Sequence, residues 1–261
     1  KAHRRFHYRI VRCLTCGLVR SDSVFDPATI EEFYAESPFV YGDESAHLAA
    51  AYLKAGEAIF RQLPRTSRII EVGCGNGFFL QALHERGWQN LVGYEPSREA
   101  IARADPRIAP CIEPVMFEAI AVPAASADLI CFFHVFDHLL EPLAFLEICQ
   151  RVLKPGGFIY GITHDLAAWP HRLWGESSLA YDIQHIYLFD RHTIRRVLGQ
   201  SGLAVQSVAP LWNTFRIGYI AQAASLPAWV QRLLRFSGLG ALPITMPVGN
   251  MSFIAQKPNL P

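Results

Sequence analysis

A glycine-rich turn between a predicted strand and a predicted helix most constrains how this chain of 261 residues can fold. The apolar run 69–72 leads into a Gly-x-Gly-x-Gly segment, and a helical pattern starts at Phe78. Glycines permit positive φ angles and let a ligand approach the backbone, while the first turn of the helix offers free N–H groups. A turn in this context predicts a site for a nucleotide-type cofactor.

Two acidic residues near this turn help to distinguish between cofactors. A dinucleotide fingerprint spaces its glycines as Gly-x-Gly-x-x-Gly and holds a pyrophosphate at the helix N-terminus. Here Glu71 precedes Gly73, and an anion at that place would repel a pyrophosphate but attract a cationic amino group. Glu95 ends the next predicted strand, where a carboxylate can accept both hydroxyls of an adenosine ribose. A purely structural glycine turn is the alternative.

Short apolar runs alternate with helical patterns through most of the chain. Predicted strands cover 68–72, 91–94, 108–112, 129–133, 158–162, 203–208 and 251–256, and predicted helices cover 45–63, 78–85, 98–104, 143–153 and 193–200. Strands that alternate with helices of this length predict an α/β fold with a parallel sheet and helices on both faces.

The motifs along this alternation resemble those of class I S-adenosylmethionine (SAM)-dependent methyltransferases. They are Glu71-Val72-Gly73-Cys74-Gly75-Asn76-Gly77, Val92-Gly93-Tyr94-Glu95-Pro96-Ser97, Asp128-Leu129-Ile130, His134-Val135-Phe136-Asp137-His138 and Leu153-Lys154-Pro155-Gly156-Gly157. The resemblance implies a Rossmann-like sheet of seven mostly parallel strands, of which the last is antiparallel, and an enzyme that transfers the methyl group of SAM to a small molecule.

The same resemblance implies which residues bind SAM. They lie in the glycine turn and after the second and fourth strands of the sheet: Glu71, Gly73, Cys74, Gly75, Asn76, Gly77, Tyr94, Glu95, Pro96, His134 and Val135. Many relatives also carry an acid after the third strand that contacts adenine. The equivalent positions here are Met116 and Phe117, so we expect apolar contacts and backbone groups to hold the adenine.

A single close cysteine pair, Cys13 and Cys16, precedes this region. Two thiolates at this spacing can share a tetrahedral Zn²⁺, which needs four ligands. The pair resembles half of the N-terminal zinc ribbon of some sugar methyltransferases of this class. Three interpretations stay open: a half-ribbon whose partner lies upstream of Lys1, a remnant that binds no metal, or a site completed by His3 and His7.

Histidines are the candidates for acceptor chemistry, because removal of a proton from a hydroxyl or carbon acid suits an imidazole near neutral pH. His185 is the first candidate, since its segment resembles one in which sugar C-methyltransferases carry Tyr-x-Glu-His. Asp182 and Gln184 replace that tyrosine and glutamate, which argues against carbon methylation. His138 is the second candidate. For both, a packing or hydrogen-bonding role is the alternative.

The sequence divides into an appendage, 1–44, and a methyltransferase domain, 45–261. The appendage holds the cysteine pair and a predicted lid with the aromatic residues Phe33, Tyr34, Phe39 and Tyr41. Within the domain, 164–189 is predicted to be a loop on the acceptor side and 211–247 an apolar insertion.

Charge is distributed unevenly, although the net charge is only +1. Residues 1–20 carry six cations and residues 191–261 carry seven, and neither stretch has an acid. The overall balance does not suggest a nucleic-acid binder. The basic C-terminal stretch favours an anionic acceptor, such as a nucleotide-linked sugar or a precursor of a polysaccharide or lipid, or an acidic partner surface.

Several broader expectations follow from the same patterns. Residues 1–12 lack the apolar run of a signal peptide, and glycines and prolines interrupt the uncharged run 236–256, so we expect a cytoplasmic protein without a transmembrane helix. The apolar, basic stretch 217–236 is compatible with packing on the sheet, a homodimer interface or peripheral membrane contact. The alternative functions are an inactive SAM-binding interaction module and a nicotinamide-dependent oxidoreductase, against which the glycine spacing argues.

Overall fold

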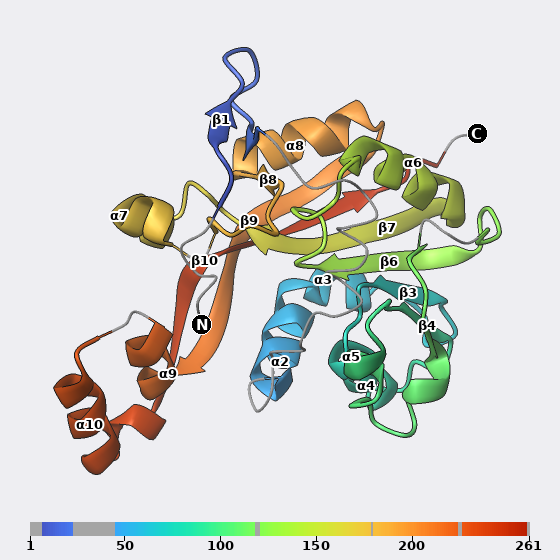
Figure 1. The fold of residues 1–261 in the computed structure, drawn as a ribbon. Helices are drawn as coiled ribbons and strands as arrows, with labels where there is room; N and C mark the ends of the chain where they lie inside the picture. The colour runs from blue at the N-terminus through green and yellow to red at the C-terminus, as the bar shows by residue number, and fades with distance from the viewer. Residues whose placement is uncertain (1–6, 23–44, 118–120, 179, 224–225, 260–261) are drawn as a thin grey trace.

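The computed structural model describes residues 7–22, 45–117, 121–178, 180–223 and 226–259 (Figure 1). Two expectations from the sequence, the lid aromatics within 33–41 and the metal-binding role of His3, lie outside the described residues.

A seven-stranded sheet with the order β5-β4-β3-β6-β7-β10-β9 forms the centre of the molecule. Its strands are β3 (Ile69–Val72), β4 (Leu91–Tyr94), β5 (Ile112–Glu113), β6 (Ala127–Phe133), β7 (Leu153–His164), β9 (Ala204–Arg216) and β10 (Pro243–Gln256). The strands from β5 to β7 pair in parallel, and β10 is antiparallel to both of its neighbours. The predicted Rossmann-like sheet with an antiparallel last strand is confirmed.

Helices cover both faces of this sheet (Figure 1). The helices α2 (Ser45–Ala55), α3 (Glu57–Phe60) and α4 (Phe78–His84) share one apolar core with it, and α6 (Pro142–Val152) and α8 (Arg191–Gln200) share another. Side chains of β3 alternate between the two cores, with Ile70 and Val72 on the α6 side and Ile69 on the α4 side. By this alternation Glu71 points toward α4.

Two predicted helices and one predicted strand in the first half of the chain differ from the structure. The helix predicted over 45–63 is divided into α2 and α3 at Gly56, and α5 (Arg98–Ile101) is shorter than predicted. The strand predicted over 108–112 is wrong for most of its length, because Ala109–Cys111 forms the 3₁₀ turn η2. Pro110 explains the difference, since a proline has no N–H for a sheet ladder.

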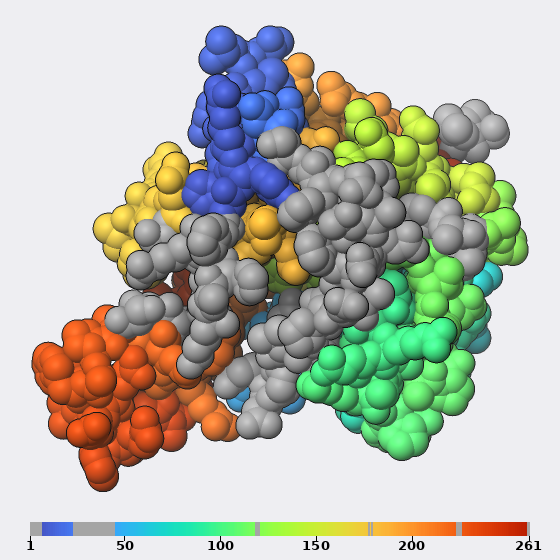
Figure 2. Space-filling model, in the orientation of Figure 1, coloured from blue at the N-terminus to red at the C-terminus, as the bar shows by residue number. Residues whose placement is uncertain are grey.

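The predicted apolar insertion, 211–247, lengthens the last two strands of the sheet. β9 and β10 stay paired as far as Arg216 and Pro243, and α9 (Ile217–Ala223), α10 (Ala228–Phe236) and η5 (Leu239–Ala241) cap their ends. This cap forms a lobe at the lower left of the molecule (Figures 1 and 2). The side chains of Trp229 and Phe236 are 69% and 83% exposed there, so α10 is not packed on the sheet.

A small second sheet ties the N-terminal segment to the region predicted as an acceptor-side loop. It consists of β1 (Ile10–Arg12), β2 (Val19–Ser21) and β8 (Tyr187–Leu188), with β2 in the middle. The predicted loop also contains α7 (Trp169–Trp174) and the 3₁₀ turn η4 (Gly175–Ser177). None of the helices in the described ranges is both long enough and apolar enough to cross a membrane.

Candidate active site

The glycine turn joins β3 to α4 through left-handed backbone conformations. Gly73, Gly75 and Gly77 have φ angles of 66°, 57° and 71°, which glycine adopts without the steric cost of a Cβ. The Gly73 N–H donates to the Tyr94 carbonyl oxygen at 2.8 Å, and the Gly75 N–H donates to Glu95 Oε2 at 2.8 Å. The turn after β3 is thus held by the end of β4.

The turn also touches the segment that follows β6. A Cβ on Gly73 would lie 2.5 Å from Cγ2 of Val135, and a Cβ on Gly77 would lie 2.7 Å from Cγ2 of Ile108. Because β3, β4 and β6 are parallel neighbours, their carboxyl ends meet at one edge of the sheet. The structure therefore brings together the segments that sequence reasoning connected only by resemblance.

Glu95 is buried at this edge with both carboxylate oxygens engaged. Oε2 accepts from the Gly75 N–H and Oε1 accepts from the Ser97 N–H, each at 2.8 Å. Burial raises the pKa of Glu95, and these two hydrogen bonds oppose the rise. The carboxylate is fixed in place, and each oxygen keeps lone pairs for a further donor.

Glu71 is 2% exposed, and its Oε2 atom finds no hydrogen-bond partner among the described residues. Burial and the nearby charge of Glu95 raise the pKa of Glu71, and a backbone hydrogen bond from Leu80 opposes the rise. A buried polar atom without a partner costs free energy. A cationic amino group bound beside Glu71 would supply the missing partner, so the donor set of this site fits the amino-acid end of SAM.

The other residues predicted to bind SAM lie around this turn. Cys74 is buried with its Sγ against Gly93, where a Cβ would lie only 2.6 Å away. Asn76 Oδ1 accepts from the Phe78 N–H at the start of α4. The rings of Tyr94 and Phe117 are buried, and their centroids are 5.3 Å apart. Pro96 and Met116, which are close to these residues in the sequence, are partly buried.

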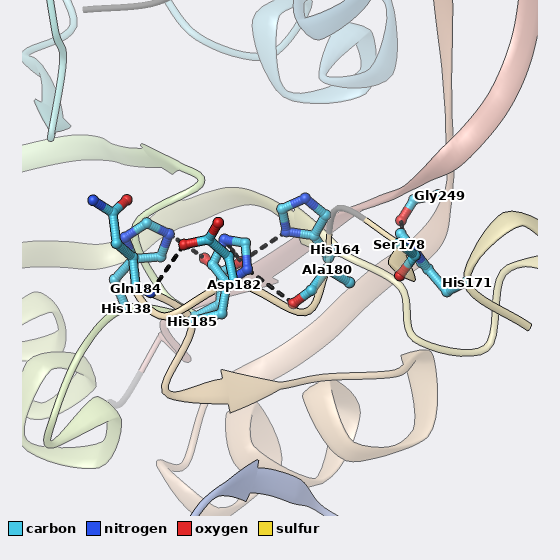
Figure 3. Close-up of polar contacts among 10 residues, drawn as sticks. His138, His164, His171, Ser178, Ala180, Asp182, Gln184, His185 and Gly249 are labelled. Atoms are coloured by element: carbon cyan, nitrogen blue, oxygen red, sulfur yellow. Dashed lines mark hydrogen bonds and ion pairs between the residues drawn. The ribbon is translucent and has the colours of Figure 1, made fainter. Parts of the chain in front are cut away.

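A second group of polar side chains comes from the segment after β6, the end of β7, α7 and the segment before β8. This histidine cluster consists of Asp137 and five histidines whose ring centroids lie 4.7–5.9 Å from a neighbour: His134, His138, His164, His171 and His185. Figure 3 shows four of these rings. His134 is one of the residues predicted to bind SAM, and its φ of 55° is unusual for a side chain with a Cβ. His134 directly follows β6, and the next residue, Val135, lies against Gly73 of the glycine turn.

Asp137 is the centre of the cluster, and its side chain is almost completely buried. The His164 Nδ1–H donates to Oδ2 at 3.0 Å. His185 Nε2 lies 3.8 Å from Oδ2, and His138 Nε2 lies 3.8 Å from Oδ1. The sequence does not predict this central position of Asp137, although the residue lies in the motif His134-Val135-Phe136-Asp137-His138.

The cluster combines an anion with neutral rings. Burial lowers the pKa of His134 to about 3 and the pKa values of His138 and His164 to about 4. Burial raises the pKa of Asp137, but the facing histidines lower it further, so it lies well below its usual range. These shifts favour an ionised Asp137 carboxylate beside uncharged His134, His138 and His164 rings.

His171 is bound to protein groups on both ring nitrogens. Its Nε2–H donates to the Gly249 carbonyl oxygen at 2.9 Å, and Nδ1 accepts from the Ser178 hydroxyl at 3.1 Å. Figure 3 shows this ring apart from those of His138, His164 and His185. His171 therefore joins α7 to β10 and takes no part in the chemistry we consider.

His185 is held from two sides. Its Nδ1–H donates to the Ala180 carbonyl oxygen at 2.9 Å, and its own carbonyl oxygen accepts from the Ser21 hydroxyl at 3.1 Å. The Ser21 N–H also donates to the Ile186 carbonyl oxygen at 2.8 Å. The N-terminal hairpin thus positions the segment that carries His185.

The cysteine pair lies in the turn between β1 and β2. Hydrogen bonds with the backbone and side chain of Cys16 lower the pKa of Cys13 to about 7. In the described ranges no third side chain completes a metal-binding group with the pair. The His7 ring lies beside Glu176, with His7 Nε2 3.7 Å from Glu176 Oε2.

Fold and site together define a Rossmann-like methyltransferase. Residues 45–208 match the family described as "Methyltransferase domain". This match covers more than half of the chain, and the protein therefore belongs to that methyltransferase family.

Curated relatives are similar over only part of their length. The ubiquinone biosynthesis O-methyltransferase of Ralstonia nicotianae is 28% identical over 99 residues, which are 36% of this chain and 41% of that protein. The mitochondrial ubiquinone biosynthesis O-methyltransferase of Homo sapiens is 27% identical over 165 residues, which are 57% of this chain and 44% of that protein. The chain thus spans less than half the length of these relatives.

Solved structures show the same fold. A SAM-dependent methyltransferase from Thermotoga maritima superposes with a TM-score of 0.56 at 15% identity, covering 83% of this chain and 92% of the other. One from Aquifex aeolicus gives a TM-score of 0.51 at 17% identity, covering 89% and 99%. At these identities the similarity concerns the fold alone.

Proposed function

We propose that this protein transfers the methyl group of SAM to a hydroxyl group of a small molecule. The observation that carries the proposal is the single sheet edge at which the glycine turn, two buried glutamates and the histidine cluster meet. The acids suit a cofactor with an amino group and ribose hydroxyls, and the histidines suit an acceptor that must lose a proton.

SAM would lie along the turn after β3. Glu71 would bind its amino group, the backbone of Gly73, Gly75 and Gly77 would face its methionine part, and Glu95 would accept from both ribose hydroxyls. Cys74, Asn76, Tyr94 and Pro96 would support this surface, Met116 and Phe117 would contact adenine, and His134 and Val135 would lie beside the cofactor. SAM itself supplies an electrophilic methyl group when bound.

The acceptor would lie between the cofactor and the histidine cluster. His185 and His138 are the residues we assign to acceptor chemistry, in which a ring nitrogen would take the proton of the acceptor hydroxyl while its oxygen attacks the methyl carbon in line and SAH leaves. Ala180 and Asp137 would orient the His185 ring for this step. Oxygen methylation is supported by the names of the curated relatives and by the Asp182 and Gln184 substitutions.

Charge and exposure favour an anionic acceptor, such as a nucleotide-linked sugar or a polysaccharide or lipid precursor. The stretch 191–261 carries seven cations and no acid, and Arg232 and Arg235 lie on α10 beside exposed apolar side chains. That face would suit a homodimer or peripheral contact with a membrane. We further propose a cytoplasmic location and division of the chain at residues 44 and 45. Cys13 and Cys16 would bind zinc if ligands upstream complete their site.

Calorimetry with S-adenosylhomocysteine (SAH), the demethylated product, tests the cofactor assignment. We expect SAH to bind with a micromolar or tighter dissociation constant and NAD⁺ to show no binding, because the glycine spacing differs from a dinucleotide fingerprint and Glu71 would repel a pyrophosphate. Absence of SAH binding at micromolar concentration would overturn the proposed function. Binding of NAD⁺ alone would favour the oxidoreductase.

Replacing Glu71 by glutamine is expected to stabilise the protein without SAM and to weaken SAH binding. The pKa of Glu71 is raised above its ordinary value of 4.5, so the folded state holds the proton more tightly than the unfolded state. Wild-type stability should therefore fall as pH rises from 4.5 through the raised pKa, and Glu71→Gln should remove this loss.

Thermal unfolding between pH 5 and pH 8, about the range of greatest protein stability, measures this effect with and without SAH. Glu57→Gln is the control, since Glu57 is an exposed residue of α3 paired with Arg61. Identical pH profiles for wild type and Glu71→Gln would contradict the assignment of Glu71.

A further inference from the structure

The His185 ring lies against the carboxylate of Asp137. A carbonyl oxygen can only accept a hydrogen bond, so the bond to Ala180 places a proton on His185 Nδ1. The other ring nitrogen, Nε2, lies 3.8 Å from Asp137 Oδ2. An imidazole nitrogen and a carboxylate oxygen are both common metal ligands, so one ion could be bound by the two atoms.

The other oxygen of Asp137 faces a similar arrangement. Oδ1 is buried and accepts no hydrogen bond within the described part of the chain, and His138 Nε2 lies 3.8 Å from it. Both 3.8 Å separations exceed a hydrogen bond. In a tetrahedral site each ligand atom lies about 2.0 Å from the ion, so two ligand atoms lie about 3.3 Å from each other. The observed separations are close to this value. The three ligand atoms of Asp137, His138 and His185 lie within 4.8 Å of one another.

We propose that Asp137, His138 and His185 bind one divalent transition-metal ion, with Zn²⁺ as the representative case. Two imidazoles and one carboxylate form a common set for zinc and leave a coordination position open. The acceptor hydroxyl is the group that would occupy this position. This last step rests on the proposed function, whereas binding of the ion does not.

The surroundings of the three ligands match those of known metal sites. Ligating histidines usually donate their second ring N–H to a carbonyl or carboxylate oxygen, as His185 does to Ala180. The His164 Nδ1–H donates to Asp137 Oδ2 and would hold the carboxylate in orientation. A second group, His134, Asp137 and His164, shares the carboxylate, but its His164 Nδ1 is already used in this hydrogen bond.

The ion would place a positive charge where the acceptor oxygen develops negative charge. A hydroxyl coordinated to Zn²⁺ would lose its proton to solvent water at a lower pH than a free one, and its oxygen would then attack the methyl group of SAM, from which SAH leaves. His185 and His138 would then act on the acceptor through the ion. In the absence of the ion they would contact the acceptor directly. The two arrangements differ in whether the protein binds a metal ion, which can be measured without turnover.

The test uses the full chain with Cys13→Ser and Cys16→Ser. These substitutions remove the cysteine pair near the N-terminus, which is a second candidate for metal binding. After treatment with a chelator and dialysis, Zn²⁺ is titrated by calorimetry and Co²⁺ by its visible absorption. We expect one ion per chain with a micromolar or tighter dissociation constant. Asp137→Asn and His185→Gln should each weaken binding by about 100-fold or more.

The matched control is His192→Gln, because His192 is an exposed histidine on α8 outside the cluster, and we expect no change in ion binding. SAH binding by every variant shows that the fold is intact. Failure of the parent to bind either ion would overturn the inference, and so would unchanged binding in both Asp137→Asn and His185→Gln. If the protein binds SAH but no metal ion, the metal site is rejected and the proposed function is kept. If it binds the metal ion but not SAH, the proposed function is rejected and the metal site is kept.

Discussion

Replacing Glu95 by alanine is expected to weaken SAH binding by at least about 100-fold. The carboxylate is buried at the end of β4, in the place we assign to the two ribose hydroxyls. Hydrogen bonds to a charged group contribute about 1.5–3 kcal/mol each, and loss of two corresponds to roughly 100-fold or more in affinity. The variant also removes the acceptor that fixes the Gly75 N–H, which should loosen the glycine turn.

Calorimetry with SAH measures this loss, and Glu99→Ala is the control. Glu99 lies four residues further along on α5, where it is exposed and paired with Arg103. We expect the control to bind SAH as the wild type does. An affinity of Glu95→Ala within about threefold of wild type, less than the tenfold that 1.4 kcal/mol represents, would show that the ribose lies elsewhere.

Replacing His185 by glutamine should lower methyl transfer by about 100-fold or more and leave SAH binding unchanged. The ring lies in the cluster on the acceptor side and is fixed by Ala180, so glutamine keeps a polar group but loses the imidazole lone pair. Contributions of positioned acid–base groups are typically about 100-fold to 10,000-fold. Release of SAH from SAM in the presence of nucleotide-linked sugars measures the rate.

The same assay distinguishes an enzyme from an inactive SAM-binding module. A module would release no SAH with any acceptor, and His185→Gln would change nothing. His192→Gln, on the exposed side of α8, should retain the wild-type rate. A full rate for His185→Gln would remove His185 from the acceptor chemistry.

The strand, turn and helix of the proposed cofactor site could be predicted because their determinants are contiguous in the sequence. The strand, the glycine turn and the helix follow each other within residues 69–84, and Glu95 directly follows the next strand. Each part depends on local properties, such as the positive φ angles of the three glycines. The order of these strands in the sheet then follows from parallel pairing of β3 with β4 and with β6.

The histidine cluster could not be assembled in the same way. Its members come from the segment after β6, the end of β7, α7 and the segment before β8, and no spacing in the sequence relates them. Asp137 becomes the centre only when β6 and β7 lie side by side and the segment of His185 folds back over their ends. The full length of β9 and β10 was missed for a related reason, since each strand is stabilised by the other.

The N-terminal hairpin has a consequence for how this protein can be altered. Its Ser21 hydroxyl reaches the backbone of His185 across 164 positions of sequence, and β2 pairs with β8 just beyond. A segment that looks detachable in the sequence is therefore bound to the segment that carries His185. A chimera designed to exchange acceptor preference between relatives would therefore have to exchange both the hairpin and the residues around 185.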